Sequence, residues 1–349
     1  MTAPPPPAYA TQACFRHPDR DAGVRCVRCD RPICGDCMVP ASVGFQCPEC
    51  VREGSRGARQ ATTSYGGRLR RPGPVTYALI GLNLVVFAIT VIGAGSSHLG
   101  QAFLGGYQTS IFDDFALIPP AVAHGEAYRL VTAAFLHYGI LHIAFNMWAL
   151  YVVGPVVEAA LGRWRYVAVY FLSGIGGSIL TVAFASPASQ SAGASGAIFG
   201  LFGALYVLQR RVGQSSVAIL STIVLNLIIT FSIPNISWEG HVGGLITGTA
   251  VTLALTATIG SPQGRTQRHI AVIGGAAVLL AAFGFLAVNR VGSECSGATT
   301  NSLVFDYCQV YDPGSDQVPT GGNAAGGPGV VPSVYSSVTT SIGRSGTHA

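Results

Sequence analysis

Charged residues are scarce in this sequence. Only 10% of the 349 residues are Asp, Glu, Lys or Arg, whereas 49% are hydrophobic and the mean hydropathy is +0.46. A soluble domain normally carries about 25% charged residues, so most of this chain is expected to lie in lipid. Lysine is missing: all 20 basic residues are arginines, and 11 of them precede residue 72. The net charge of +5 therefore reflects the N-terminal region and short loops, and does not indicate a nucleic-acid-binding surface.

Several segments lack the pattern of a folded element. The N-terminal MTAPPPPAYATQ has neither the basic start nor the apolar core of a cleavable signal peptide, and residues 1–12 are expected to be disordered. Residues 53–74 are basic and glycine-rich without apolar periodicity, which is typical of a linker. The tail, residues 289–349, ends in Gly, Ser, Pro and Thr and is expected to be largely disordered because it cannot bury enough apolar surface to fold.

Long apolar segments follow one another between residues 75 and 288, each close to the roughly 20 residues that cross a bilayer. The seven predicted spans are 75–94, 140–160, 166–185, 194–209, 215–232, 240–259 and 270–288. Every second loop is rich in arginine, as cytoplasmic loops are. We therefore expect a multi-pass plasma-membrane protein with a cytoplasmic N-terminus and an extracytoplasmic C-terminus.

Four polar residues lie at a comparable depth in this arrangement. His142 and Asn146 lie in the first turns of the second span, Ser195 begins the fourth, and His241 begins the sixth. All three spans run inward, so these side chains gather near the outer ends of the helices. Ionisable groups inside a membrane are costly and usually face the bundle interior, so the coincidence indicates a shared site.

The four residue types suit acyl transfer. A serine hydroxyl is a weak nucleophile that needs a base within hydrogen-bonding reach, and His241 is the candidate base for Ser195. The two spans carry small residues that let helices pack closely in lipid: Gly196, Gly200 and Gly203 in one, and Gly240, Gly244 and Gly248 in the other. His142 and Asn146 share a helical face and, with the Ser195 backbone N–H, could stabilise an oxyanion.

Each residue alone has a structural interpretation. A serine among small residues is usually helix packing, and Asn146 alone could form an interhelical hydrogen bond. His137 is either structural or interfacial. The soluble-hydrolase motif G-x-S-x-G fails because Ala197 stands where its final glycine would be, and no strand precedes the serine.

Three stretches resemble the rhomboid intramembrane serine proteases. FLHYGILHIAFN (135–146), GASGAIFG (193–200) and GHVGGLITG (240–248) are similar to that family's H-x-x-x-N, G-x-S-G and H-x-x-G-x-x-x-G elements, in the same order. The resemblance implies an all-α fold: a six-helix core over 75–260 with a seventh transmembrane helix over 270–288. It also implies a Ser195–His241 dyad without a carboxylate, an oxyanion hole of His142 and Asn146, and cleavage in or beside transmembrane segments of membrane proteins.

Two positions depart from the family pattern. Tyr128-Arg129 stands where the family has a Trp-Arg pair, and Phe199 stands where many bacterial members have a tyrosine packed on the histidine. We further expect the loop 233–240 to cap a water-accessible cavity, and the fifth span to move with it to admit substrate.

Three other functions would also suit a bundle of membrane helices. A catalytically silent relative that binds membrane proteins should lack the serine or the histidine, and this chain keeps both. A small-solute transporter should show inverted repeats or charged residues at mid-membrane, and we find no clear repeat. A membrane bundle that only anchors the N-terminal region would not need the four polar residues.

Residues 13–52 contain four closely spaced ligand pairs with the spacing C-x2-H or C-x2-C. The pairs are Cys14 with His17, Cys26 with Cys29, Cys34 with Cys37, and Cys47 with Cys50. Eight soft ligands suffice for two tetrahedral zinc sites, and a reducing cytoplasm argues against disulfides. No set leaves an open position, so the zinc is expected to be structural, and this region could dock a protein partner.

The same stretch resembles a B-box-type, cross-braced zinc finger. In a cross-brace the first and third pairs share one ion and the second and fourth share the other; the alternative is a consecutive arrangement. Two further cysteines, Cys295 and Cys308, follow the last span on the outer side, where an oxidising environment favours a disulfide.

Overall fold

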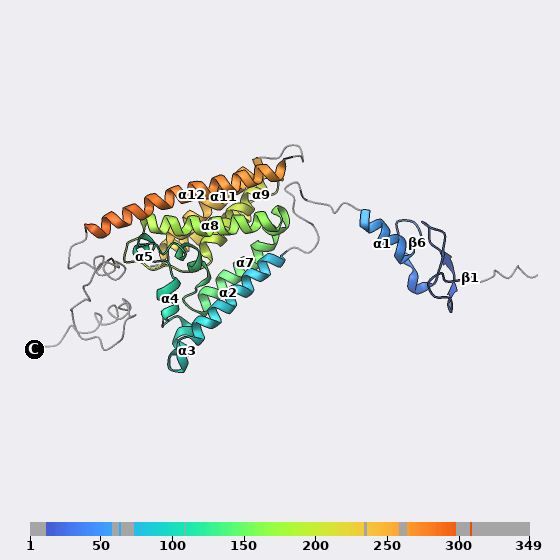
Figure 1. The fold of residues 1–349 in the computed structure, drawn as a ribbon, viewed down its shortest axis with the longest axis horizontal. Helices are drawn as coiled ribbons and strands as arrows, with labels where there is room; N and C mark the ends of the chain where they lie inside the picture. The colour runs from blue at the N-terminus through green and yellow to red at the C-terminus, as the bar shows by residue number, and fades with distance from the viewer. Residues whose placement is uncertain are drawn as a thin grey trace, which may run out of the picture. The chain divides into compact units, whose positions relative to one another are not determined.

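The computed structural model describes residues 12–57, 63, 73–107, 109–233, 236–257, 264–297 and 308. The chain divides into two compact units, residues 1–61 and 62–349, each with its own core (Figure 1). The segments predicted to be disordered, 1–12 and 289–349, and the predicted linker, 53–74, fall mostly outside the described residues, so these assignments stay predictions.

The N-terminal unit is built from three short antiparallel hairpins and one helix. β1 (Gln12–Ala13) pairs with β2 (Asp21–Ala22), β3 (Val24–Arg25) with β4 (Pro32–Ile33), and β5 (Val39–Pro40) with β6 (Phe45–Gln46). A 3-10 turn, η1, covers Gly35–Cys37, and α1 covers Pro48–Gly57, beyond the predicted boundary at residue 52. Its buried residues are Ile33 and six cysteines, so apolar burial alone contributes little to its stability.

The second unit is a helical bundle, which confirms the predicted fold class. Its long helices are α2 (Pro74–Ile92), α7 (Ile140–Leu161), α8 (Arg163–Phe184), α9 (Ser195–Arg211), α10 (Val217–Ser232), α11 (Trp238–Ala257) and α12 (Arg265–Ser296). Among the described residues, five of these are long and apolar enough to cross a membrane: α2, α7, α8, α11 and α12. The other two are shorter, with 17 residues in α9 and 16 in α10. The chain is a multi-pass membrane protein.

The boundaries of the seventh span differ from the prediction. α12 extends from Arg265 to Ser296, well beyond the predicted 270–288. The predicted bounds follow hydropathy alone, whereas the helix continues through polar residues at both ends, where no proline interrupts it. The structure confirms the expected disulfide between Cys295, in the last turn of α12, and Cys308.

The region between α2 and α7, predicted only as an outer loop, consists of short helices. These are α3 (Gly95–Leu104), α4 (Ser110–Phe115), α5 (Pro119–Ala123), α6 (Arg129–Thr132) and the 3-10 turn η2 (Ala133–Phe135). The buried guanidinium of Arg129 organises this region by donating to the carbonyls of Asp113 (2.7 Å) and Ala116 (2.8 Å) and pairing with Glu126 (2.5 Å). A buried charge must be paired and hydrogen-bonded in this way.

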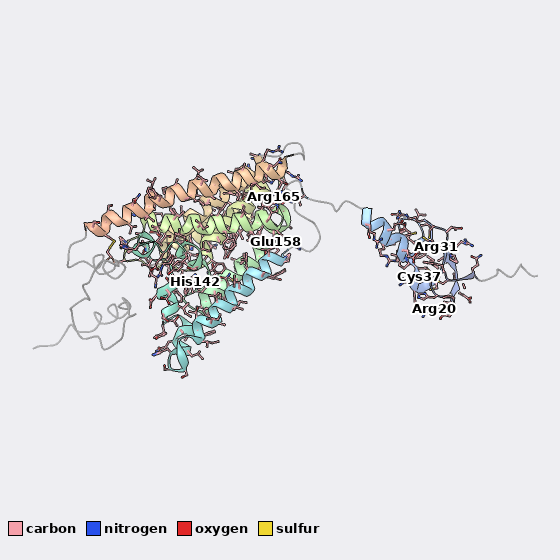
Figure 2. The ribbon with its side chains drawn as sticks, viewed as in Figure 1. Arg20, Arg31, Cys37, His142, Glu158 and Arg165 are labelled. Atoms are coloured by element: carbon pink, nitrogen blue, oxygen red, sulfur yellow. A yellow bond between two sulfur atoms is a disulfide. The ribbon has the colours of Figure 1, made fainter. Side chains whose placement is uncertain are left out.

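Two buried polar contacts fix the ends of the bundle helices. The Glu158 carboxylate on α7 accepts hydrogen bonds from the backbone N–H groups of Val75 (3.1 Å) and Thr76 (2.9 Å), which caps the otherwise unpaired N-terminus of α2. Arg165 at the start of α8 donates to His269 of α12 (2.6 Å), and α12 lies along α8 (Figures 1 and 2). These contacts attach the first and last long helices to the middle of the bundle.

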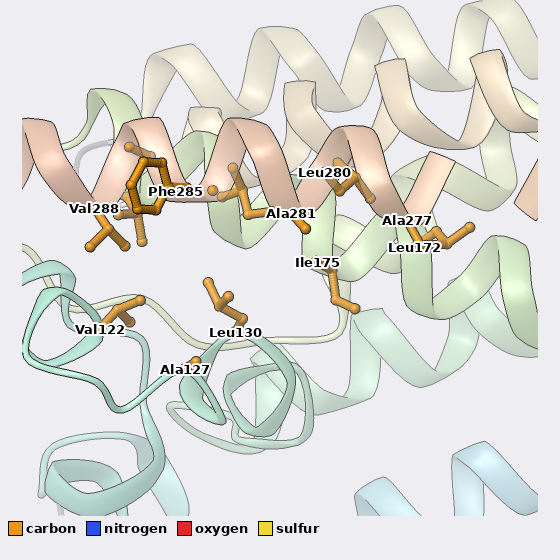
Figure 3. A pocket seen from close by; sticks show the side chains of 14 residues that line it. Val122, Ala127, Leu130, Leu172, Ile175, Ala277, Leu280, Ala281, Phe285 and Val288 are labelled. Carbon is orange, nitrogen blue, oxygen red and sulfur yellow. The ribbon is translucent and has the colours of Figure 1, made fainter. Parts of the chain in front are cut away.

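An apolar cavity of about 460 Å³ lies between α12, α8 and the short helices that connect α2 to α7 (Figure 3). Leu280 and Phe285 of α12, Ile175 of α8 and Leu130 of α6 are among its lining residues, all of which are apolar. None of the four predicted catalytic residues lines it. The water-accessible cavity expected at the catalytic residues is therefore not this one, and it stays a prediction.

Candidate active site and metal-binding clusters

Ser195 and His241 lie together although 46 residues separate them. Ser195 is the first residue of α9, and His241 lies in the first turn of α11. The Oγ atom of Ser195 is 2.7 Å from Nε2 of His241, and both residues are half-buried. This distance is within the range in which a base can accept a hydroxyl proton.

Glycine residues on three helices allow this approach. α8, α9 and α11 contact one another closely. A Cβ atom on Gly177 of α8 would lie 2.5 Å from the Gly240 carbonyl oxygen, and one on Gly196 would lie 3.1 Å from the same oxygen. A Cβ atom on Gly248 of α11 would overlap the backbone of Gly200. Without side chains at these positions the backbones can pack at the separation that the pair requires.

Two neighbours hold the His241 ring on its other sides. Phe199, one turn after Ser195, stacks on the imidazole with ring centroids 4.3 Å apart and planes 12° apart. The resemblance to the rhomboid family predicts this contact at position 199. The second neighbour is Thr230 of α10, whose Oγ1 lies 2.7 Å from the Nδ1 atom of His241. The sequence alone did not predict this contact. A threonine in an apolar helix carries no signal that distinguishes it from a packing residue.

His142 also lies beside the serine. A Cβ atom on Gly193 would be 2.9 Å from His142 Nε2 and 3.7 Å from Ser195 Oγ, so the imidazole and the hydroxyl flank this glycine. Gly193 has φ +133°, a backbone conformation that favours glycine. The His142 Nδ1 atom accepts a hydrogen bond from the Tyr138 backbone N–H (3.4 Å). Nε2 of the neutral ring therefore carries the proton and can donate it.

Asn146 is buried one turn further along α7 and is engaged within its own helix. Its amide Nδ2 donates to the His142 carbonyl at 2.9 Å. The amide has a second N–H, and that hydrogen is the one available to an oxyanion. Ser195 itself opens α9, so its backbone N–H belongs to the first turn, whose N–H groups have no intrahelical partner.

His137 and Tyr128 lie outside the serine–histidine contact. His137 is 2% exposed, its ring centroid is 5.0 Å from that of His142, and burial lowers its pKa to about 3. It is therefore neutral at physiological pH, which suits the structural interpretation. The Tyr128 hydroxyl donates to the Glu126 carboxylate (2.9 Å) among the short helices between α2 and α7, next to Arg129.

The eight ligands of the N-terminal unit form two clusters. In each, the candidate donor atoms all lie within 4.8 Å of one another. One cluster contains Cys14, His17, Cys34 and Cys37, and the other contains Cys26, Cys29, Cys47 and Cys50. The structure thus brings together the first and third pairs and the second and fourth, which is the cross-braced rather than the consecutive arrangement.

The spacing of donor atoms fits a tetrahedral ion. His17 Nδ1 lies 3.3 Å from Cys34 Sγ and 3.5 Å from Cys37 Sγ, and Cys29 Sγ lies 3.8 Å from Cys47 Sγ. Tetrahedral zinc, with Zn–N of about 2.0 Å and Zn–S of about 2.3 Å, separates such atoms by roughly 3.5 to 3.8 Å. The two clusters therefore have the ligand types and spacing of structural metal sites.

Residues 124–258 match the rhomboid domain family. The chain is 38% identical over 188 residues to the Rhomboid protease GluP of Bacillus subtilis (strain 168), covering 52% of this chain and 34% of GluP. It is 33% identical over 180 residues to the protein named "Putative rhomboid protease YdcA" of the same organism, covering 50% of this chain and 85% of that protein.

A fungal relative shows the same partial coverage. The chain is 33% identical over 169 residues to Rhomboid-type serine protease 2 of Emericella nidulans, covering 44% of this chain and 33% of that protein. The similarity thus spans only about a third of GluP and of the fungal protein, but most of YdcA. Residues 124–258, which match the family, contain all four residues of the candidate active site, and the resemblance inferred from the three motifs is confirmed. This chain belongs to the rhomboid family.

Proposed function

We propose that this chain is an intramembrane serine endopeptidase that cleaves transmembrane or juxtamembrane segments of membrane proteins. The observation that carries the proposal is the 2.7 Å contact between Ser195 Oγ and His241 Nε2 inside a bundle of membrane helices. The relatives' names as rhomboid proteases support the same reaction class.

In this mechanism Ser195 Oγ attacks the scissile carbonyl carbon while its proton passes to His241 Nε2. The carbonyl electrons move onto oxygen, and the oxyanion accepts hydrogen bonds from His142 Nε2–H, the free Asn146 N–H and the Ser195 backbone N–H. Collapse of the intermediate breaks the C–N bond, and His241 gives its proton to the leaving amine. Water then attacks the acyl-serine with His241 again as base, which releases the second product and restores Ser195.

The arrangement of the bundle suits a peptide bond near the outer surface. The proposed orientation has a cytoplasmic N-terminus and an extracytoplasmic C-terminus in the plasma membrane. In this orientation the candidate catalytic residues, at the starts of α7, α9 and α11, lie at the outer end of the bundle. Substrates are proposed to be transmembrane proteins whose helices unwind near the cut. The N-terminal unit is proposed to hold two structural zinc ions and to dock a protein partner.

Cleavage of a tagged single-span substrate in proteoliposomes tests this function. The wild type is expected to produce one fragment whose new N-terminus lies in or beside the outer part of the transmembrane segment. Ser195→Ala should produce none while keeping the melting temperature of the wild type. Equal products from both proteins would show cleavage that does not depend on Ser195 and would reject the proposal. No product from a folded wild type would also reject it and would favour a membrane-protein-binding role without cleavage.

A further inference from the structure

Thr230 lies at the junction between the Ser195–His241 pair and helix α10. Its Oγ1 is 2.7 Å from His241 Nδ1 and also 2.7 Å from the carbonyl oxygen of Asn226, one turn earlier in α10. The side chain is only 4% exposed. Two short contacts on one buried hydroxyl restrict where its single proton can lie.

The proton positions follow from the partners. A carbonyl oxygen can only accept, so the Thr230 O–H donates to Asn226. The hydroxyl oxygen is then left to accept from His241, and the imidazole must carry its proton on Nδ1. In a neutral ring Nε2 is thereby unprotonated, and Nε2 is the atom that faces Ser195 at 2.7 Å.

We propose that Thr230 is the positioning residue of the dyad: its hydroxyl fixes the His241 tautomer in which Nε2 can accept the serine proton. This inference rests on the proposed protease function and adds to it a third group, on a different helix, that orients the base. The proposed dyad has no carboxylate to perform this task. The threonine also keeps an acceptor next to Nδ1–H when His241 becomes an imidazolium during the reaction.

The location of Thr230 ties this task to the position of α10. Only three residues of α10 are buried: Ile219, Ile223 and Thr230. Most of its other large apolar side chains are exposed, including Leu225 and Phe231 at 58% and 64%. A helix held by so few buried side chains can separate from the bundle more easily than α8 or α9.

This hydrogen bond links substrate admission to the orientation of the base. If α10 moves to admit a transmembrane substrate, the Thr230–His241 hydrogen bond breaks and the imidazole loses its orientation. The base is restored only when α10 returns to its place against α11. Cleavage is thus allowed in the closed arrangement, where this hydrogen bond is intact, and suppressed in the open one, where it is broken.

Thr230→Val tests the inference because valine keeps the shape of threonine and removes only the hydroxyl. We expect kcat to fall roughly ten- to a hundredfold, while KM changes less than about twofold. This loss is smaller than most of the roughly hundred- to ten-thousandfold that a positioned general base contributes, because the variant keeps the base and removes only the group that orients it. Thr230→Ser, which restores a hydroxyl, should recover kcat to within about threefold of the wild type. The rate of reaction with a small fluorophosphonate should fall with kcat, since both depend on the base.

Thr222→Val is the matched control. Thr222 lies two turns earlier on α10, and its hydroxyl likewise donates to the carbonyl four residues back, that of Ala218 (2.9 Å). This hydroxyl has no contact with His241, so the variant should keep the wild-type kcat. Equal losses in Thr222→Val and Thr230→Val would show an effect on helix packing and overturn the inference.

Nitrogen-15 spectra of histidine-labelled protein give a readout independent of turnover. The His241 signals, assigned by their loss in His241→Ala, should show a protonated Nδ1 in the wild type and a changed Nδ1 signal in Thr230→Val. Protonation at Nε2 in the resting protein would overturn the inference. An inactive wild type would instead reject the proposed function, and an active wild type with an equally active Thr230→Val would reject only the role of Thr230.

Discussion

The backbone of Gly244 in α11 lies directly against the carbonyl group of Gly196 in α9. A Cβ atom added to Gly244 would overlap that carbonyl oxygen and would lie within 3.0 Å of the Gly196 Cα. Gly196 follows Ser195, and Gly244 lies one turn after His241. The close approach of these two glycines therefore sets the distance between the two candidate catalytic side chains.

Gly244→Ala should separate α9 from α11 and weaken the protein. The clash is with backbone, which cannot move aside without shifting a helix, so we expect a loss of about 1–3 kcal/mol of stability together with a large loss of turnover. A thermal melt and a cleavage assay measure both effects. Gly275→Ala in α12 is the control, because a Cβ atom there has no heavy atom within 4 Å. A Gly244→Ala protein as stable and active as this control would contradict the packing account.

Asn146→Ala tests the proposed oxyanion site. Removing one donor from such a site typically lowers kcat by about a hundred- to a thousandfold, which is less than the loss expected for Ser195→Ala. KM should change little because the donor acts mainly on the transition state. Kinetics in detergent at several substrate concentrations separate the two constants. An unchanged kcat would remove Asn146 from the mechanism and leave it a packing residue hydrogen-bonded to His142.

Two double variants distinguish the cross-braced zinc arrangement from the consecutive one. The wild type is expected to bind two zinc ions per chain. In the cross-brace Cys14 and Cys37 belong to one cluster, so replacing both with serine should remove one ion and leave the other. Replacing Cys14 and Cys26, which belong to different clusters, should remove both.

Metal analysis of the purified full chain measures how many zinc ions the wild type and each double variant bind. The consecutive arrangement predicts the reverse order, with two ions lost from the Cys14/Cys37 variant and one from the Cys14/Cys26 variant. Because metal binding supplies much of the folding free energy of small zinc domains, either loss should also increase protease sensitivity of residues 13–52. The bundle should keep its melting temperature.

The sequence predicts the membrane helices and the candidate site well because both depend on local signals. Hydropathy marks the long helices, and the motif spacing puts His142, Ser195 and His241 at one depth. Short helices such as α5 have weaker signals: its proline pair, Pro119-Pro120, suits a helix start, but five residues give no apolar periodicity.

Thr230 shows what the sequence could not predict. Thr222 and Thr230 lie in the same apolar helix and each donates to a carbonyl four residues earlier. Nothing local distinguishes them, because the contact with His241 depends on how α10 packs against α11. The pairing of the candidate zinc ligands differs from this case. The spacing of the cysteines alone indicates two sites without their partners, whereas the resemblance to a cross-braced zinc finger implies the partners that the three hairpins bring together.

Reaction of the purified, detergent-solubilised protein with a fluorophosphonate, read by intact mass, tests the central claim most directly. The wild type is expected to gain the mass of a single adduct, and Ser195→Ala and His241→Ala are expected to gain none. This result would establish that Ser195 is a nucleophile activated by His241. A folded wild type without an adduct, or an adduct of equal yield in Ser195→Ala, would contradict the account and assign the glycines around Ser195 to helix packing alone.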